Sequence, residues 1–411
     1  MTDTQEKFKS FDSLLFANGE PSGQAILKHS CVDFIVDEEL GFPLSGNGEH
    51  LCIRIQKTDI TTAQLVRHLR ELFKVDSSAI GYGGLKDRRA ITSQWFSVQL
   101  PAGEDSDEKL LASIENESLK VLENSRNSRK IKIGSHRANH FVIRLRDCTE
   151  DGQALQDLST KVWETRLENI STQGVPNYFG PQRFGWDYSN LQQVWELMES
   201  ALPGPSGAQQ ESGGAKQENA SAQQRGRRRG RQGRGRNNRN GMLFSAARSY
   251  LFNLQLSHRL ELSNWAQYLQ GDVLNLDGSN RCFLLDEGLM WDEEMQQRLD
   301  SFDIHITGLL PGTIESKERY VSSGKSADIE DAVCKEYPIL LEGLKFFGLK
   351  ASRRSFRFRP ADLKWDWQDG DLNGTRDLIL EFTLPRGAYA SSLLRELCHT
   401  KNSELAAVSR S

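Results

Sequence analysis

The chain has 411 residues, of which 37% are hydrophobic, and a formal net charge of -4. This length accommodates two domains, or one domain that carries a large insertion. The apolar runs are far shorter than the roughly 18 residues of a membrane-spanning helix, and the polar start is not that of a signal peptide, so we expect a cytoplasmic protein without a membrane partner. Because the net charge is negative, any nucleic-acid site must be a local basic patch.

The metal-ligating residue types show no pattern of a metal site. The six cysteines are scattered and include no CxxC pair, which predicts reduced thiols. His136 and His140 stand four residues apart, but they begin an alternating segment with no third ligand nearby. We therefore expect no bound metal.

The first part of the chain alternates in the manner of strands. Residues 31–37 and 49–57 each alternate apolar and polar side chains, which predicts two half-buried strands. Thr61, with Gln64 three residues later, forms a capping box, which predicts a helix that ends near Val75.

The stretch GYGGLKDRRAITSQWFS, residues 81–97, combines glycines with one acid, Asp87, among three cations. The glycines predict a tight loop, and the alternation that follows predicts a strand over 94–100. Neighbouring cations keep a carboxylate ionised, so Asp87 can serve as a nucleophile or a base. The alternative is a solvated, salt-bridged turn, which the chemistry of the loop residues alone favours.

The next segments suggest contacts to nucleic acid. A basic stretch, 126–137, leads into an alternating strand over 141–145, and a helix is predicted from about 155 to 170. In GVPNYFGPQRFG, residues 174–185, two aromatics precede Arg183. Such side chains can stack on bases and hold phosphate, although packing is the simpler reading.

Residues 203–241 are of low complexity, with eight arginines and one lysine against two glutamates. With almost no apolar residue they cannot bury a core, so we expect a disordered segment. Its Arg/Gly-rich tract, 225–239, is of the type that binds RNA backbone without sequence preference; a tolerated loop insertion is the alternative.

In the last part of the chain, Ser245 can cap a long helix. Strands are predicted in GDVLNL and RCFLL and over 363–367 and 378–384, followed by a helix capped by Ser391 or Ser392. Strands therefore lie at both ends with a helical block between them, which indicates one mixed-sheet domain interrupted by an insertion.

Six motifs resemble, in order, those of the TruD family of tRNA pseudouridine synthases. GGLKDRRAITSQW resembles the catalytic motif of the family, which most often has lysine where Arg88 stands. The others are LKxxxxDF with a following acid at Lys28 to Glu38, RANHFVIRLR, VPNYFGPQRFG, LFSAARSYLFN and LPxGxYASSLLREL. They extend from about residue 23 to residue 400.

The resemblance implies an α+β fold, a pseudouridine-synthase mixed sheet flanked by helices, with an inserted α/β TRUD domain. The catalytic domain is then discontinuous, 1–173 and 359–411, and the inserted domain is 174–358, with the disordered 203–241 inside it. The implied reaction converts the uridine at position 13 of tRNA to pseudouridine, without cofactor or metal. We expect a monomer.

The resemblance also assigns roles to residues. Asp87 and Lys28 are the catalytic aspartate and its cation, and the substrate-contacting positions are Phe34, Asn139, Phe141 and Tyr389, where the family usually has phenylalanine at the last. Lys86, Arg88 and Arg183 are candidate RNA contacts. A base must be flipped out of a folded RNA before its glycosidic bond can react. Asp87 would then attack C1′ of the sugar or remove a C2′ proton.

Two other classes of function remain possible. An RNA-binding module or RNA chaperone without catalysis would make Asp87 a structural turn residue. A carboxylate glycosidase acting on nucleosides would need a second acid at a defined separation, and the motif contains none.

Overall fold

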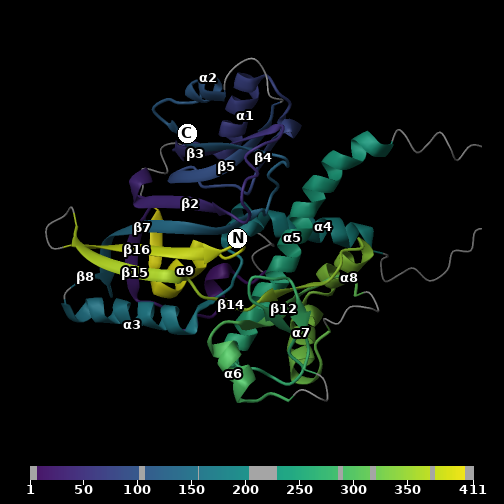
Figure 1. Cartoon of the computed structure of the whole chain (residues 1–411). Coiled ribbons are helices and arrows are strands. Elements are labelled where there is room, and N and C mark those ends of the chain that lie inside the picture. Colours follow the sequence, from purple (N-terminus) through teal and green to yellow (C-terminus); the bar gives the residue numbers. More distant parts are fainter. Residues whose placement is uncertain are drawn as a thin grey trace, which may run out of the picture. The chain divides into compact units, whose positions relative to one another are not determined.

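The computed structural model divides into two compact units (Figure 1). The sheet unit comprises residues 20–175 and 358–411, and the helical unit comprises 1–19 and 176–357. The structure describes residues 7–100, 107–155, 157–202, 229–285, 290–314, 321–370 and 375–402.

The sheet unit is built on one large mixed sheet. Its strands are β1 (Gly23–Leu27), β2 (Phe34–Leu40), β3 (His50–Thr58), β4 (Ile80–Tyr82), β5 (Ile91–Gln99), β6 (Leu119–Asn127), β7 (His136–Glu150), β8 (Gln153–Ala154), β15 (Ala361–Asp369), β16 (Arg376–Pro385) and β17 (His399–Asn402). Among the described residues the main strand order is β15-β16-β7-β2-β5-β3-β6. The strand β2 pairs parallel with β5 and antiparallel with β7. The mixed sheet with flanking helices confirms the α+β class.

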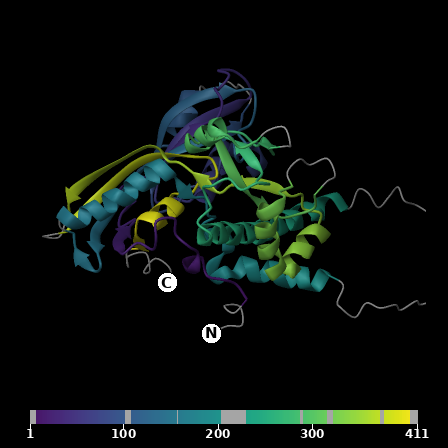
Figure 2. The ribbon, with the colours of Figure 1, turned by 90° about the horizontal axis from the view of Figure 1, so that it is seen from below.

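Helices cover the sheet through two apolar clusters. The helices of this unit are α1 (Thr62–Phe73), α2 (Asp107–Ala112), α3 (Asp157–Gln173) and α9 (Ala390–Leu397), with short 3-10 helices η2 (Cys31–Asp33) and η3 (Ser77–Ala79). One cluster joins α3 and α9 to β7 and β16, and the other joins α1 to β3 and β5. Figure 2 shows α3 lying along β15 and β16, where Trp163 contacts Trp367 with ring centroids 5.8 Å apart.

The helical unit combines helices with a small sheet of four strands within its described residues. Its elements are η1 (Phe11–Ser13), η4 (Pro181–Phe184), η5 (Trp186–Tyr188), α4 (Ser189–Ala201), α5 (Arg229–Glu261), β10 (Leu274–Leu276), β11 (Cys282–Phe283), α6 (Glu293–Asp300), β12 (Ile304–Leu310), α7 (Gly324–Glu336), α8 (Pro338–Phe346) and β13 (Ser352–Ser355). The strand order is β11-β10-β12-β13. The strands β9 (Val175–Pro176) and β14 (Arg357–Phe358) stand where the chain passes between the units.

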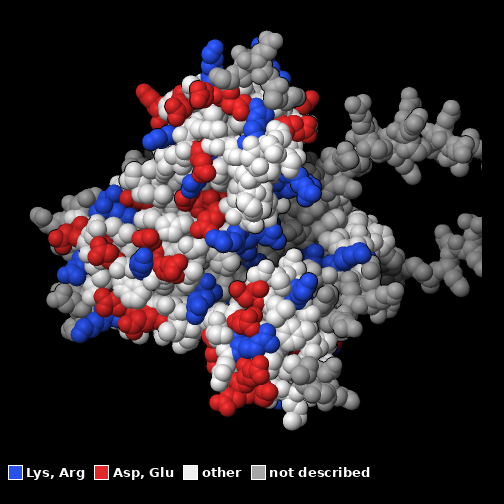
Figure 3. All heavy atoms as spheres, in the orientation of Figure 1, with Lys and Arg blue, Asp and Glu red and all other residues white. Residues whose placement is uncertain are grey.

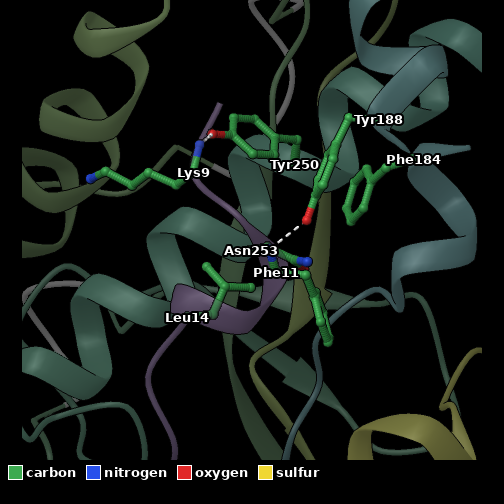
Figure 4. A pocket seen from close by; sticks show the side chains of 7 residues that line it. All are labelled: Lys9, Phe11, Leu14, Phe184, Tyr188, Tyr250 and Asn253. Carbon is green, nitrogen blue, oxygen red and sulfur yellow. Dashed lines mark hydrogen bonds between the residues drawn. The ribbon is translucent and has the colours of Figure 1, made fainter. Parts of the chain in front are cut away.

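The first described residues belong to the helical unit, whereas the sequence placed them with the catalytic domain. Phe11 and Leu14 are buried, and they line a small pocket with Phe184, Tyr188 and Tyr250 (Figure 4). The Lys9 amide donates to the Tyr250 hydroxyl at 2.7 Å. Burial of these aromatic contacts explains the assignment.

Three further expectations are corrected by local structure. Cys31–Asp33 is a capped 3-10 turn, and the strand begins only at Phe34. Ser245 lies inside α5, which starts at Arg229 and so includes the end of the segment predicted to be disordered. Extending a helix costs much less than nucleating one, and the buried turns after Ser245 supply the nucleus. The helix α9 begins at Ala390, before either predicted cap. Residues 203–228 lie outside the described part.

Among the helices in the described part of the chain, none is long and apolar enough to cross a membrane. The capping box at the start of α1 is confirmed: the Thr61 side chain accepts from the Gln64 amide, and the Gln64 side chain accepts from the Thr61 amide.

Loss of this cap should weaken the packing of α1. Replacing Thr61 by Ala removes the acceptor for one helix amide, so Thr61→Ala should lower the free energy of unfolding by about 1 kcal/mol. Urea unfolding followed by circular dichroism measures the change. Thr61→Ser keeps the hydroxyl and should retain most of the stability; an equal loss in both variants would contradict the cap's role.

Candidate active site

The site begins with the turn that precedes β2. Asp33 is fully buried, and its carboxylate accepts from the Ser30 amide at 2.7 Å and the Ser30 hydroxyl at 2.8 Å. Arg146 of β7 pairs with the same carboxylate at 2.8 Å. Burial alone would raise the pKa of Asp33, but the hydrogen bonds from Arg146 and Ser30 hold it below its ordinary value. Asp33 is therefore a charged anchor that fixes the start of the strand at Phe34.

Lys28 lies between the Asp87 carboxylate and an aromatic ring. Its Nζ is 3.1 Å from Asp87 Oδ1 and 4.0 Å from the centroid of the Phe34 ring. The Lys28 side chain is 20% exposed, whereas that of Asp87 is 54% exposed. The backbone of Lys28 has a φ of 56°, which is unusual for a non-glycine residue. The Asp87 carboxylate is thus reachable from solvent, while the Lys28 ammonium is largely buried against the Phe34 ring.

The phenylalanines form a continuous group on three adjacent strands. Phe34 and Phe141 meet edge to face with ring centroids 6.1 Å apart, and Phe141 stacks on Phe382 at 5.3 Å. All three are buried. Phe141 and Phe382 stack because they stand directly opposite each other on the paired strands β7 and β16. Phe382 was not singled out from the sequence, although it continues the alternating apolar face of its strand.

Asn139 lies two residues before Phe141 on β7 and therefore on the same face of the strand, where the side chains become polar. Its backbone partners are Glu38 of β2 and Leu384 of β16. The Asn139 Oδ1 atom is buried and makes no hydrogen bond with the described residues. A buried acceptor without a partner costs about 1–3 kcal/mol, so it is a candidate for binding a ligand's N–H or O–H.

The loop that carries Asp87 is held through its main chain. The Lys86 amide donates to Thr62 Oγ1 at 2.9 Å, and Gln94 Nε2 donates to the Gly84 carbonyl at 2.9 Å. Lys57 Nζ donates to the Asp87 carbonyl at 2.7 Å. Because three side chains from other elements bind this backbone, the loop is a defined part of the fold.

Lys86 does not lie on the RNA-facing surface that was predicted for it. Its Nζ is 2.6 Å from Glu38 Oε2, and the side chains are 7% and 0% exposed. The Trp95 amide donates to the same Glu38 carboxylate at 3.2 Å. A Cβ at Gly83 would stand 3.1 Å from both Glu38 oxygens, so glycine allows the loop to pass close to this ion pair. We correct the assignment: Lys86 is a buried partner of Glu38.

The remaining predicted residues lie at the periphery of this group or outside it. Arg88 is 53% exposed, and its Nε is 3.2 Å from Asp59 Oδ1. Tyr389 is half-buried and precedes α9, four residues after Pro385, the backbone partner of Ala138. Arg183 belongs to the helical unit, where its guanidinium lies 5.3 Å from the Phe179 ring centroid. The structure therefore joins Lys28, Phe34, Phe141 and Asp87 by contacts and Asn139 by register.

Sequence reasoning missed Glu38 and Lys57 as parts of this site. Each continues an apolar face at a spacing of two residues: Glu38 follows Phe34 and Val36, and Lys57 follows Ile55 on its strand. A charged residue at a core-facing position was the available signal. No group of three or more possible metal ligands occurs among the described residues.

Removing the charge of Glu38 should destabilise the sheet unit. Glu38→Gln leaves the Lys86 ammonium buried without its carboxylate, which should lower the free energy of unfolding by about 3 kcal/mol or more. The matched control is Glu39→Gln, because Glu39 pairs with the exposed Arg137 and such pairs contribute under about 1 kcal/mol. Urea unfolding measures both; equal effects would contradict the importance of the buried pair.

Comparisons with known proteins agree along nearly the whole chain. The family profile of tRNA pseudouridine synthase D (TruD) matches residues 11–198 and 236–397. The tRNA pseudouridine synthase D of Psychrobacter arcticus is 36% identical over 393 residues, covering 92% of this chain and 91% of that protein. The protein of the same name from Nitrosococcus oceani is 36% identical over 388 residues, covering 94% of each. A solved TruD structure from Methanosarcina mazei, 22% identical, has a TM-score of 0.65 and covers 96% of this chain and 97% of that one, which shows the shared fold.

Proposed function

This chain belongs to the TruD family of tRNA pseudouridine synthases, and we propose that it isomerises a uridine of tRNA, at position 13, with Asp87 as the reacting carboxylate. The observation that carries the proposal is the arrangement of Asp87, Lys28 and Phe34: a reachable carboxylate, its cation at 3.1 Å, and a ring against that cation. No cofactor is part of the proposal.

Asp87 supplies the chemistry in its ionised form. The Lys28 ammonium lies 3.1 Å from Asp87 Oδ1, where it can hold the carboxylate in position. The carboxylate either attacks C1′ of the ribose or removes the C2′ proton. In the first route an Asp87–C1′ ester bond forms as the C1′–N1 bond breaks; in the second, Asp87 takes the C2′ proton as that bond breaks and later returns it to C2′. The freed uracil turns within the site, and C5 bonds to C1′, which in the first route releases the Asp87 carboxylate. The proton on C5 is then lost and N1 gains a proton. The reaction is an isomerisation, so no atom is gained or lost.

The target base must leave the RNA stack before it reaches Asp87. Flipping a base costs a few kcal/mol, and stacking on an aromatic side chain returns about 1–3 kcal/mol. Phe34 and Phe141 are 5% and 8% exposed and belong to a continuous group of buried rings. We propose that the flipped uracil rests against these two rings, with Tyr389 contributing the third ring.

Asn139 orients the base or the sugar. Its buried Oδ1 can accept a hydrogen bond from the uracil N3–H or from a ribose hydroxyl, which would satisfy an atom without a partner among the described residues. Where the donor is the uracil N3–H, cytosine, which has no N3–H, would leave this acceptor unsatisfied, so that contact favours uracil over cytosine.

Contacts to the RNA backbone are expected from a limited set of exposed cations. Acidic and basic side chains are interspersed on the face of the molecule in Figure 3. Arg137, at the start of β7, pairs with Glu39, and Arg129 and Lys132, which precede this strand, are exposed. We propose that these two side chains and Arg88 position the phosphates.

Replacement of the proposed reacting group tests the function directly. Asp87→Asn keeps the shape but removes the charge, so pseudouridine formation in unmodified tRNA should fall by more than about 10³-fold, as expected when an essential base or nucleophile is lost. Purified protein is incubated with unmodified tRNA, and the product nucleosides are measured. The matched control is Asp76→Asn, an exposed acid, which should retain full activity.

Two outcomes would change the proposal. Equal product from Asp87→Asn and wild type would remove Asp87 from the chemistry. Absence of product from wild type, with tRNA still bound, would favour the RNA-binding module without catalysis.

The role of Asn139 is tested separately from that of Asp87. Asn139→Leu removes the buried acceptor and leaves the donor of the bound nucleotide unsatisfied, which costs about 1–3 kcal/mol. We expect the rate of isomerisation at saturating protein to fall by about 5- to 150-fold. Single-turnover measurements provide this rate, with the exposed Asn124→Leu as control. An unchanged rate in Asn139→Leu would exclude a contact with the reacting nucleotide.

A further inference from the structure

We propose that Lys57 is a positioning residue for Asp87: a buried ammonium that fixes the main chain of the Asp87 loop and places a second positive charge behind the carboxylate. The inference rests on the proposed function, because it assigns to Lys57 an effect on a reaction carried out by Asp87.

The first support is the geometry of the Lys57 ammonium. Lys57 lies on β3 and is 0% exposed. Its Nζ donates to the main-chain carbonyls of Asp87 at 2.7 Å and Ile60 at 2.6 Å. One buried group thus joins the loop that carries the proposed reacting carboxylate to the turn that precedes α1. Both hydrogen bonds are charge-assisted, which makes them stronger than neutral ones.

The second support is the cost of placing a lysine at this position. Leu51, Ile53 and Ile55 occupy the same face of β3 and are all fully buried. An apolar residue at position 57 would continue that face, whereas a buried ammonium is desolvated at a cost of several kcal/mol. Perturbed, buried titratable groups concentrate at functional sites. The hydrogen bond from Lys57 to the Asp87 carbonyl explains why a lysine, and not an apolar residue, occupies this position.

The surroundings of Lys57 determine when it is charged. Burial lowers the pKa of Lys57 to about 8; the nearby Asp87 carboxylate opposes that shift and Lys86 adds to it, while Cys31 and Asp59 act weakly in the same direction as Asp87. Since the pKa is lowered, the charge is present below about pH 8 and is lost as the pH rises through that value. The neutral Lys57 amine can still donate two hydrogen bonds. Deprotonation therefore removes the positive charge but keeps the hydrogen bonds to the two carbonyls.

Lys57 and Lys28 therefore act on different parts of Asp87. Lys28 contacts the carboxylate oxygen and is partly exposed, whereas Lys57 binds the carbonyl of the same residue from the interior of the sheet. If Lys57 only stabilised the fold, the rate of isomerisation in folded protein would not follow its titration.

The experiment combines a pH profile with one substitution. Single-turnover isomerisation of unmodified tRNA is measured from pH 6 to 9 for wild type, Lys57→Met and Lys120→Met. Lys120 is an exposed lysine on β6 opposite Gln56, so it is a matched control. Circular dichroism and urea unfolding establish the folded fraction, and titration with tRNA establishes the affinity.

We expect the wild-type and Lys120→Met rates to fall as the pH rises through about 8. Lys57→Met should be slower by about 10²-fold at pH 7, as for the loss of one preorganised electrostatic group, should bind tRNA within twofold of wild type, and should show no fall near pH 8. A Lys57→Met rate equal to that of Lys120→Met would overturn the proposal, as would an unchanged alkaline fall in Lys57→Met.

If Lys57→Met does not fold, the rate of the wild-type protein as a function of pH decides, and a rate that stays constant from pH 7 to 9 would overturn the proposal.

The Asp87→Asn variant separates the proposed function of the protein from the proposed role of Lys57. Activity retained in Asp87→Asn would refute the proposed function, whereas loss in Asp87→Asn with full activity in Lys57→Met would refute only the role of Lys57.

Discussion

The contact between Lys28 and Asp87 is the interaction on which the proposed site depends. The Asp87 side chain is more than half exposed, so its position depends on a partner, and the Lys28 ammonium supplies that partner at 3.1 Å. Lys28 is itself restrained by the Phe34 ring at 4.0 Å. The carboxylate, the cation and the ring thus form one unit, and displacement of any member would move the others.

Buried charged side chains next to the glycine-rich loop that carries Asp87 restrict the conformation of that loop. The pair of Glu38 and Lys86 holds one side of the loop, and Lys57 binds its main chain at Asp87. Buried ion pairs contribute little to net stability compared with apolar packing, but they restrict which arrangements are possible, because an unpaired charge there is costly. We infer that the sheet unit gives up some stability at these positions in return for a rigid reacting loop.

Much of the sheet was predictable from alternation, whereas the ion-pair partners of the buried charges were not. The aliphatic face of β3 and the capping box of α1 follow from local patterns and are confirmed. Taken alone, the charged residues around Asp87 favour a solvated turn, because charge runs are usually solvated. Which cation turns inward depends on Glu38, 48 residues earlier in the chain. The turn at Cys31 was misassigned because its capping hydrogen bonds compete with the strand pattern. Lys57 was detectable, since the same period that places Ile55 in the core also places Lys57 there.

The register of three strands determines whether the site exists. Phe141 stands opposite Val36 on one side and Phe382 on the other, and Asn139 stands opposite Glu38 and Leu384. These residues share one face, along which apolar side chains give way to polar ones at the end near the Asp87 loop. A slip of one residue would turn Phe141 and Asn139 to the opposite face and leave Glu38 without its place beside the loop. The apolar core that fixes this register is therefore also what aligns the polar end of the face for chemistry.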